Sequence, residues 1–172
     1  MSEPSAMAEA AARHHESLYR FAMALCRYDR QEAMDVLQLT YVEVLEGRAD
    51  LAHARDGKAF LLGVARRIAA SRRRRRSLFG RIMSLGSFGE PKIAGPSPEA
   101  LASACEDEAR VRRALSALPA RQLEVVTLVF MEGLTVEQAA TALSVSVGSA
   151  RTHYHRAKQS LAKMLEDHDA AR

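Results

Sequence analysis

The sequence predicts an all-helical protein made of two small helical domains joined by a linker. Ala, Leu, Arg and Glu are abundant, tryptophan is absent, and glycine and proline are scarce outside one segment, which favours helices. A length of 172 residues with 48% apolar content allows a buried core in each domain. Apolar side chains recur at spacings of three and four along most of the chain, which is the period of a helix face.

Two helices are expected first. The apolar period over residues 11–27 predicts one helix. Asp29, followed three residues later by Glu32, can cap a second helix over residues 30–46, which Gly47 should end. The expected buried stripe of this second helix comprises Ala33, Val36, Leu37, Tyr41, Val44 and Leu45. The side chains expected outside it are Asp35, Gln38, Glu43 and Glu46.

A third helix is expected from Lys58 to about Arg76, after a loop over residues 48–57, with Asp56 as its cap. Its buried side comprises Phe60, Leu61, Val64 and Ile68. The far side is a strip of small and cationic residues, namely Gly63, Arg66, Ala70 and Arg73. From Asp56 to Arg81 there are nine bases and one acid. Such a local field attracts a polyanion, with nucleic acid the first candidate and an anionic membrane surface the second.

The domain boundaries follow from composition. Residues 7–76 form the first expected domain, residues 77–105 the linker and residues 106–166 the second domain. The linker is rich in glycine and proline, yet its first part carries several apolar side chains. A disordered tether rarely holds so many apolar groups. This part either docks on a partner or forms a short helix packed on the first domain.

The second domain is expected to end in a helix-turn-helix. A helix from Glu106 stops at Pro119, and residues 120–131 are apolar on nearly every side, as in the central helix of a bundle. Thr135 and Gln138 can then close a capping box on a short helix over residues 136–143. After a two-residue break, Ser146 can cap the last helix.

This last helix has two different sides. The residues expected to pack against the preceding helices are Val147, Ala150, Tyr154, Ala157 and Leu161. The opposite side carries Gly148, Thr152, His155, Arg156 and Gln159, flanked by Arg151 and Lys158. Cations and hydrogen-bonding groups beside small residues suit the major groove of DNA. A polar face that only meets water is the alternative.

Several classes of function are excluded. No pair of catalytic carboxylates, no nucleophile with a placed histidine and no phosphate-binding glycine loop is present, so we expect neither an enzyme nor a cofactor. His14 with His15, and His153 with His155, would point apart on a helix, which argues against a metal site. Two cysteines do not make a disulfide framework, and no signal peptide or long apolar run appears. We therefore expect a cytoplasmic protein that does not insert into a membrane.

Residues 115–165 resemble the promoter-recognition domain of bacterial sigma factors of the extracytoplasmic-function group, in the sigma-70 family. The motifs that match in order and spacing are Leu118-Pro119, Arg121-Gln122, Glu132-Gly133-Leu134, Val147-Gly148-Ser149 and Arg156-Ala157-Lys158. This resemblance implies that the minus-thirty-five element is contacted by Ser149, Arg151, Thr152, His155 and Arg156. His155 is less typical of the family.

The helix over residues 33–45 looks like the one with which sigma factors bind the clamp coiled coil of RNA polymerase. Asp35 and Gln38 match its polar positions, whereas Met34 and Thr40 stand where acids are common. The resemblance implies core polymerase contacts by Asp35, Gln38 and Glu43.

The helix over residues 58–76 resembles the one that reads and opens the minus-ten element. The resemblance implies DNA contacts by Arg66, Arg67, Ser71, Arg73 and Arg74, and a flipped-base pocket walled by residues 48–56. Three positions depart from the family: Phe60 replaces the usual Trp, Arg67 stands where Asn is common, and Ser71 where Asp or Asn is common. Five consecutive arginines, residues 72–76, should add phosphate contacts that depend on salt.

The function implied is that of a sigma factor that binds core RNA polymerase and directs promoter-specific initiation, with promoter DNA as its second partner. Kinship also implies an anti-sigma factor and no small-molecule substrate. Two other functions are considered: a stand-alone dimeric helix-turn-helix regulator, and a sigma mimic that titrates an anti-sigma factor. A mimic has no need of phosphate contacts, which the cationic helices provide.

Overall fold

A computed structural model describes residue 9 and residues 12–51, 53–84 and 106–169, and the regular elements in these ranges are all helices. Residues 9–84, called the N-terminal domain below, are followed by the C-terminal domain, residues 106–169. Most of the expected linker, with Cys105, lies outside the described residues. No helix in the described ranges is both long and apolar enough to cross a membrane.

The N-terminal domain contains α2 (His15–Leu25), α3 (Arg30–Leu45) and α4 (Gly57–Ser84). Both predicted caps are confirmed, because Asp29 Oδ1 accepts a hydrogen bond from the Glu32 N–H (3.0 Å) and Asp56 Oδ1 accepts one from the Ala59 N–H (3.0 Å). α4 is longer than expected. It passes Arg76 and continues to Ser84, so the first residues of the expected linker are helical.

The buried stripe of α3 differs from the prediction at three positions, one of which is Tyr41, expected inside but only half-buried. Thr40 is fully buried, and its hydroxyl donates to the Val36 carbonyl (2.7 Å), so a polar residue fills part of the core. Leu45 was expected inside but is 53% exposed. Leu45 follows the buried Val44, and one residue on a helix turns the side chain by about 100°, out of the stripe.

The C-terminal domain contains α6 (Glu106–Ala117), α7 (Ala120–Val126), the π-helical turn η1 (Thr127–Met131), α8 (Val136–Leu143) and α9 (Val147–Asp169). The predicted capping box is present, with Gln138 N–H donating to Thr135 Oγ1 (3.1 Å) and Thr135 N–H donating to Gln138 Oε1 (2.8 Å). Ser146 caps α9 as expected by accepting from the Ser149 N–H (3.1 Å). Val147 was expected to pack against the preceding helices but is exposed.

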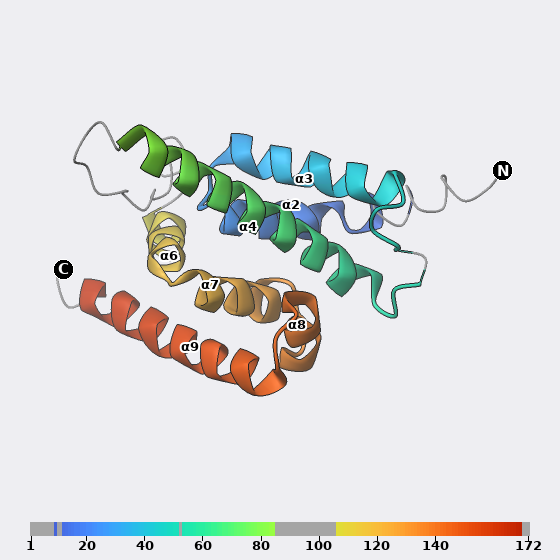
Figure 1. Cartoon of the computed structure of the whole chain (residues 1–172). Coiled ribbons are helices and arrows are strands. Elements are labelled where there is room, and N and C mark those ends of the chain that lie inside the picture. Colours follow the sequence, from blue (N-terminus) through green and yellow to red (C-terminus); the bar gives the residue numbers. More distant parts are fainter. Residues whose placement is uncertain (1–8, 10–11, 52, 85–105, 170–172) are drawn as a thin grey trace.

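The two domains pack against each other along α4. Figure 1 shows α4 running between α3 on one side and α7 and α8 on the other, with α9 on the outer side of α7. Buried side chains from both domains belong to one continuous cluster, which includes Leu62 and Ala65 of α4 with Val125 of α7 and Ala139 of α8. The apolar core therefore crosses the boundary between the domains.

Candidate nucleic-acid and partner-binding surfaces

The outer side of α9 is open to solvent. Of the residues expected to contact DNA there, Arg151, Thr152, His155 and Arg156 are exposed and Ser149 is half-buried. We call these five residues the recognition face. A Cβ added to the neighbouring Gly148 would meet nothing within 4 Å, so this end of α9 has room for close approach by a partner.

Two contacts organise the recognition face. The Thr152 hydroxyl donates to the Gly148 carbonyl (3.0 Å), and Arg151 donates to Glu137 of α8 (2.9 Å). Hydrogen bonding lowers the pKa of Glu137, first from the backbone N–H of the same residue and then from Arg151. The carboxylate thus stays charged at neutral pH and holds Arg151 at the surface.

The cationic strip of α4, Gly63, Arg66, Ala70 and Arg73, is mostly covered by the C-terminal domain and not open as the sequence suggested, although the Arg73 side chain is 51% exposed. The Arg66 side chain is only 17% exposed, and its Nε lies 3.4 Å from Oε2 of Glu124 on α7. Arg73 reaches the other oxygen of Glu124 (3.9 Å), and Ala70 is buried. A Cβ on Gly63 would lie 2.8 Å from the Ala142 carbonyl oxygen of α8, closer than real contacts allow.

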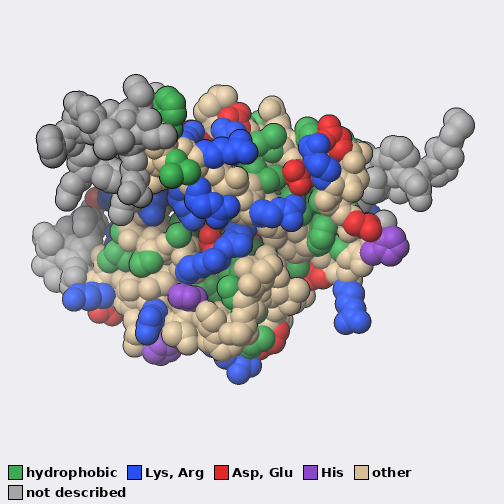
Figure 2. Space-filling view, in the orientation of Figure 1, with side chains coloured by type: hydrophobic (Ala, Val, Ile, Leu, Met, Phe, Trp, Pro, Cys, Tyr) green, Lys and Arg blue, Asp and Glu red, His purple; other side chains and the backbone are tan. Residues whose placement is uncertain are grey.

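The remaining arginines of α4 point in several directions. Arg67 is exposed and donates to Glu43 of α3 (3.2 Å). Arg72 donates to Asp35 (2.6 Å) and Arg76 to Glu32 (2.5 Å), so α4 is tied to the acidic side of α3. Arg74 and Arg75 are exposed and form no ion pair within the described ranges, and Ser71 is half-buried. Lys and Arg side chains gather over α4 on the face drawn in Figure 2.

The predicted polymerase-binding residues of α3 lie on or near its outer surface. Gln38 is exposed, whereas Asp35 and Glu43 are occupied by the arginines of α4. Beside Gln38 lies an apolar stripe that sequence analysis missed: Leu39, Val42 and Leu45 are all exposed. Their spacing of three was a usable signal, since apolar residues outside the buried stripe of a helix mark a second contact face.

A cavity of about 590 Å³ lies beside the loop before α4. Ala54, Arg55 and Asp56 line it from the segment expected to wall a flipped-base pocket, and Phe60 and Arg67 line it from α4. Its other wall belongs to α8 and comprises Gln138, Thr141, Ala142 and Ser144. Gln138 Nε2 donates to Asp56 Oδ2 (2.9 Å), so the C-terminal domain covers this cavity.

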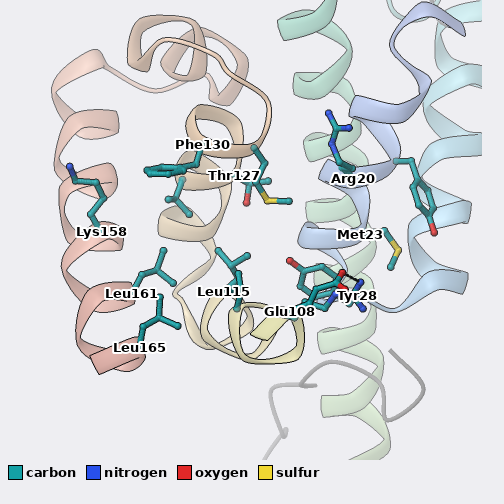
Figure 3. Close-up of a pocket in the computed structure, with 15 residues that line it drawn as sticks. Arg20, Met23, Tyr28, Glu108, Leu115, Thr127, Phe130, Lys158, Leu161 and Leu165 are labelled. Carbon is teal, nitrogen blue, oxygen red and sulfur yellow. Dashed lines mark hydrogen bonds and ion pairs between the residues drawn. The ribbon is translucent and has the colours of Figure 1, made fainter. Parts of the chain in front are cut away.

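A second, apolar groove of about 710 Å³ lies between the domains (Figure 3). Met23 lines it from α2, Tyr28 from the turn after α2, Leu115 from α6, Phe130 from η1 and Leu161 from α9. Phe130 is 71% exposed at its rim. Burial raises the pKa of the Tyr28 hydroxyl, and the Arg112 guanidinium lies 5.2 Å from the centre of the Tyr28 ring.

Metal binding and thiol reactivity have little support in the described ranges. No group of three or more His, Cys, Asp or Glu side chains there could hold a metal ion. Cys26 is buried, and burial raises the pKa of its thiol to about 12. A thiol with so high a pKa remains protonated at neutral pH and is a poor nucleophile.

Comparison with known proteins finds two matching family regions. Residues 10–79 match Sigma-70 region 2, and residues 108–161 match Sigma-70, region 4. The chain is 26% identical over 156 residues to the ECF RNA polymerase sigma factor SigX of Bacillus subtilis, covering 89% of this chain and 80% of SigX. It is 32% identical over 103 residues to the ECF RNA polymerase sigma factor SigD of Mycobacterium tuberculosis, covering 60% of this chain and 48% of SigD.

A solved structure shares the fold. The sigma factor RpoE of Bartonella quintana, in complex with the anti-sigma factor NepR, superposes with a TM-score of 0.71 at 24% identity. The alignment covers 88% of this chain and 91% of RpoE. The helical arrangement of the described residues is thus one that a known sigma factor adopts.

Proposed function

Because this chain belongs to the sigma-70 family, as an extracytoplasmic-function sigma factor that directs transcription initiation and is not an enzyme, we propose that different helices bind core polymerase and the two promoter elements. In this proposal α9 reads the minus-thirty-five element, α3 binds core RNA polymerase, and α4 with the preceding loop engages the minus-ten element.

The recognition face of α9 carries the first assignment. It follows the turn of a helix-turn-helix, lies in the part of the chain that matches region 4, and is open to solvent. Arg151 and Arg156 can reach guanine edges or phosphates, and Thr152 can contact either. Its openness is the single observation on which the proposed function depends most, since a buried face could not read DNA.

Core polymerase would bind α3. The exposed Gln38 and the apolar stripe of Leu39, Val42 and Leu45 offer a polar anchor beside apolar area, which is the usual composition of an interface centre. The clamp coiled coil is the proposed partner surface. Asp35 and Glu43 would have to exchange the arginines of α4 for polymerase groups, so we assign them a smaller share of the binding free energy.

The minus-ten element would be bound by Arg66, Arg67, Ser71, Arg73 and Arg74, with an extruded base held near the cavity beside Phe60. The cavity and the density of guanidinium groups support this assignment. Extruding a base costs a few kcal/mol of unstacking free energy, which stacking and phosphate contacts can offset.

Run-off transcription with purified core polymerase tests the whole proposal. We expect the full chain to initiate at specific promoters of the source genome, and Arg151→Ala to lower that initiation about tenfold, the loss of one good base contact. The matched control is Lys163→Ala, another exposed cation three turns along α9. Unchanged initiation by Arg151→Ala would remove α9 from the reading role.

Core binding needs a separate measurement. Gln38→Ala should weaken binding of the chain to core polymerase in a titration, whereas Arg151→Ala should bind core normally. The control for α3 is Gln31→Ala, an exposed residue on the first turn of the same helix. Equal loss in both α3 variants, or loss of core binding in Arg151→Ala, would point to misfolding and contradict the assignment.

An anti-sigma factor is the proposed regulatory partner, and the cytoplasm, where polymerase works, is the proposed location. Support for the partner comes from RpoE, which was solved in complex with the anti-sigma factor NepR. Co-purification of the tagged full chain with a protein that suppresses its run-off activity would test this part.

A further inference from the structure

Two buried carboxylates of the C-terminal domain are bound by cations of the N-terminal domain. Glu132 follows η1 and its side chain is fully buried, with Arg20 Nε at 3.2 Å and Lys58 Nζ at 3.4 Å. Lys58 also donates to the Glu132 carbonyl (2.6 Å). Glu124 of α7 is 2% exposed and receives Arg66 and Arg73 of α4 as well as Arg121 of its own helix (3.0 Å).

We propose that the C-terminal domain is an internal inhibitor of the minus-ten surface, in which Glu124 takes the place that a DNA phosphate would occupy between Arg66 and Arg73. This inference rests on the proposed assignment of α4 to the minus-ten element. The two arginines are among those that the assignment needs, and in the closed arrangement both lie against the one carboxylate of Glu124.

Closure and DNA binding exclude each other on steric grounds as well. At Gly63 the backbone of α8 lies so close to α4 that even one added carbon would meet Ala142 O at 2.8 Å. A nucleic-acid strand is far larger than a methyl group. The Asp56 to Gln138 hydrogen bond likewise places α8 across the cavity proposed for the extruded base. DNA can therefore reach this surface only after α8 has moved away.

The closed arrangement is suited to opening. Arg66 Nε is buried, but within the described residues it has no hydrogen bond of acceptable geometry, and Arg73 stands 3.9 Å from its acid. Buried ion pairs must also offset the desolvation of both charges, so they stabilise an interface weakly. Water or a phosphate would satisfy both guanidinium groups in the open form. Core polymerase and promoter DNA could thus shift the population toward that form.

Gly63→Ala tests the inference with little harm to α4. Alanine favours a helix over glycine, yet its Cβ has no room against α8, so the domains should separate. The matched control is Gly57→Ala on the same helix, where the new Cβ would make ordinary contacts inside the N-terminal domain, the nearest to Leu51 at 3.5 Å. Glu124→Gln is a second variant, which removes the charge that holds Arg66 and Arg73.

The first measurement is the radius of gyration of the full chain by X-ray scattering on a monomeric sample. The wild type and Gly57→Ala should be close to the ~16 Å of a compact chain of this length. Gly63→Ala and Glu124→Gln should both be larger. A wild type that is already extended, or two variants that both remain compact, would overturn the inference.

The second measurement is binding of a short fluorescent single-stranded DNA of mixed sequence at low salt, because arginine contacts to phosphates do not depend on sequence. Gly63→Ala should bind on the order of tenfold tighter than wild type and Gly57→Ala, since the apparent affinity scales with the open fraction. Adding Arg66→Ala to Gly63→Ala should remove that gain.

Failure of the inference and failure of the proposed function give different results. Separated domains with unchanged DNA affinity would overturn the inhibition while wild-type run-off initiation still supports a sigma factor. Separated domains whose gain in affinity survives Arg66→Ala would show that α4 is not the surface released. The minus-ten assignment would then fail together with the inference.

Discussion

The cationic strip of α4 and the recognition face of α9 both carry arginines beside small residues. The cationic strip lies against the other domain, whereas the recognition face lies in solvent. Gly63 of α4 is closed off by Ala142, whereas Gly148 of α9 has nothing within 4 Å. Arg66 and Arg73 share a buried carboxylate, whereas Arg151 pairs only with an exposed one. Charge and side-chain type are therefore alike in the cationic strip and the recognition face. Packing between the domains decides which of the two surfaces is accessible to DNA.

The C-terminal domain accounts for the difference because it places buried carboxylates against the N-terminal domain and exposed cations on α9. Glu124 of α7 and Glu132, which follows η1, contact cations of the N-terminal domain, while Arg151 and Arg156 of α9 are exposed. The carboxylates suit the cations of the N-terminal domain and the exposed cations suit DNA. In the proposed function, one small domain thus covers the proposed minus-ten surface and keeps its own proposed DNA-binding surface open. Four predictions test this contrast.

The largest effect is expected when the interdomain ion pairs of Glu132 are removed. Glu132→Ala leaves Arg20 and Lys58 without their carboxylate and should lower the free energy of unfolding by about 2–3 kcal/mol, less than for a fully buried pair because both cations keep partial access to water. Urea denaturation measures it. Glu16 is the other partner of Arg20, and its side chain is 84% exposed. Glu16→Ala should therefore lower the free energy of unfolding by less than about 1 kcal/mol. Equal losses would contradict a special role for the interdomain pair.

The next largest effect is expected in the salt dependence of DNA binding, which should differ between the recognition face and the cationic strip. Arg156 is exposed and forms no ion pair within the described ranges, so Arg156→Ala should reduce the slope of log affinity against log salt by about 1. Arg66→Ala should leave the slope unchanged in the closed chain, because the Arg66 side chain is only 17% exposed and lies against Glu124. The slope should become sensitive to Arg66→Ala only in the Gly63→Ala background. Equal sensitivity in wild type would mean that α4 is already free.

A smaller effect is expected at Glu137, which pairs with Arg151 of the recognition face. Glu137→Gln releases Arg151 from its exposed carboxylate and should tighten DNA binding about two- to threefold, as for a surface ion pair. Because the pKa of Glu137 is lowered, its stabilising pair is intact at neutral pH and is lost only as the pH falls through that lowered value. Fluorescence anisotropy at neutral pH measures the change. Weaker binding would show that Glu137 orients Arg151 for DNA.

The smallest effect is spectroscopic. Burial between the domains raises the pKa of Tyr28 above its usual 10.0, so the favourable burial of the neutral phenol is fully present below that pH and is lost as the pH rises through the raised value. Ultraviolet titration of tyrosinate should show two late-ionising tyrosines in wild type, Tyr28 and Tyr41, because burial raises the pKa of both. In Gly63→Ala only Tyr28 should titrate earlier, since Tyr41 packs within the N-terminal domain. An unchanged titration would indicate that Tyr28 is buried within its own domain.

Predictions from sequence succeeded where the physical cause is local. The caps at Asp29, Asp56 and Ser146 each join a side chain to a backbone N–H three residues away, and all three were found at the expected position. The helix-turn-helix followed from such signals and from apolar spacing. The extension of α4 to Ser84 was missed because glycines downstream suggested an early end. The π-helical turn η1 has no sequence signal that we can name.

The amino-acid sequence by itself determined the helices, their caps, the outward side of α9 and the membership in a family, because these depend on neighbours a few residues apart or on motifs in order. Only the tertiary structure decided that Gly63 and Arg66 face α7 and α8, and that Glu124 and Glu132 are buried. A polar helix face has the same periodicity whether it meets water or another domain. Which of the two it meets depends on where residues some sixty positions away come to lie, as Arg66 and Glu124 do.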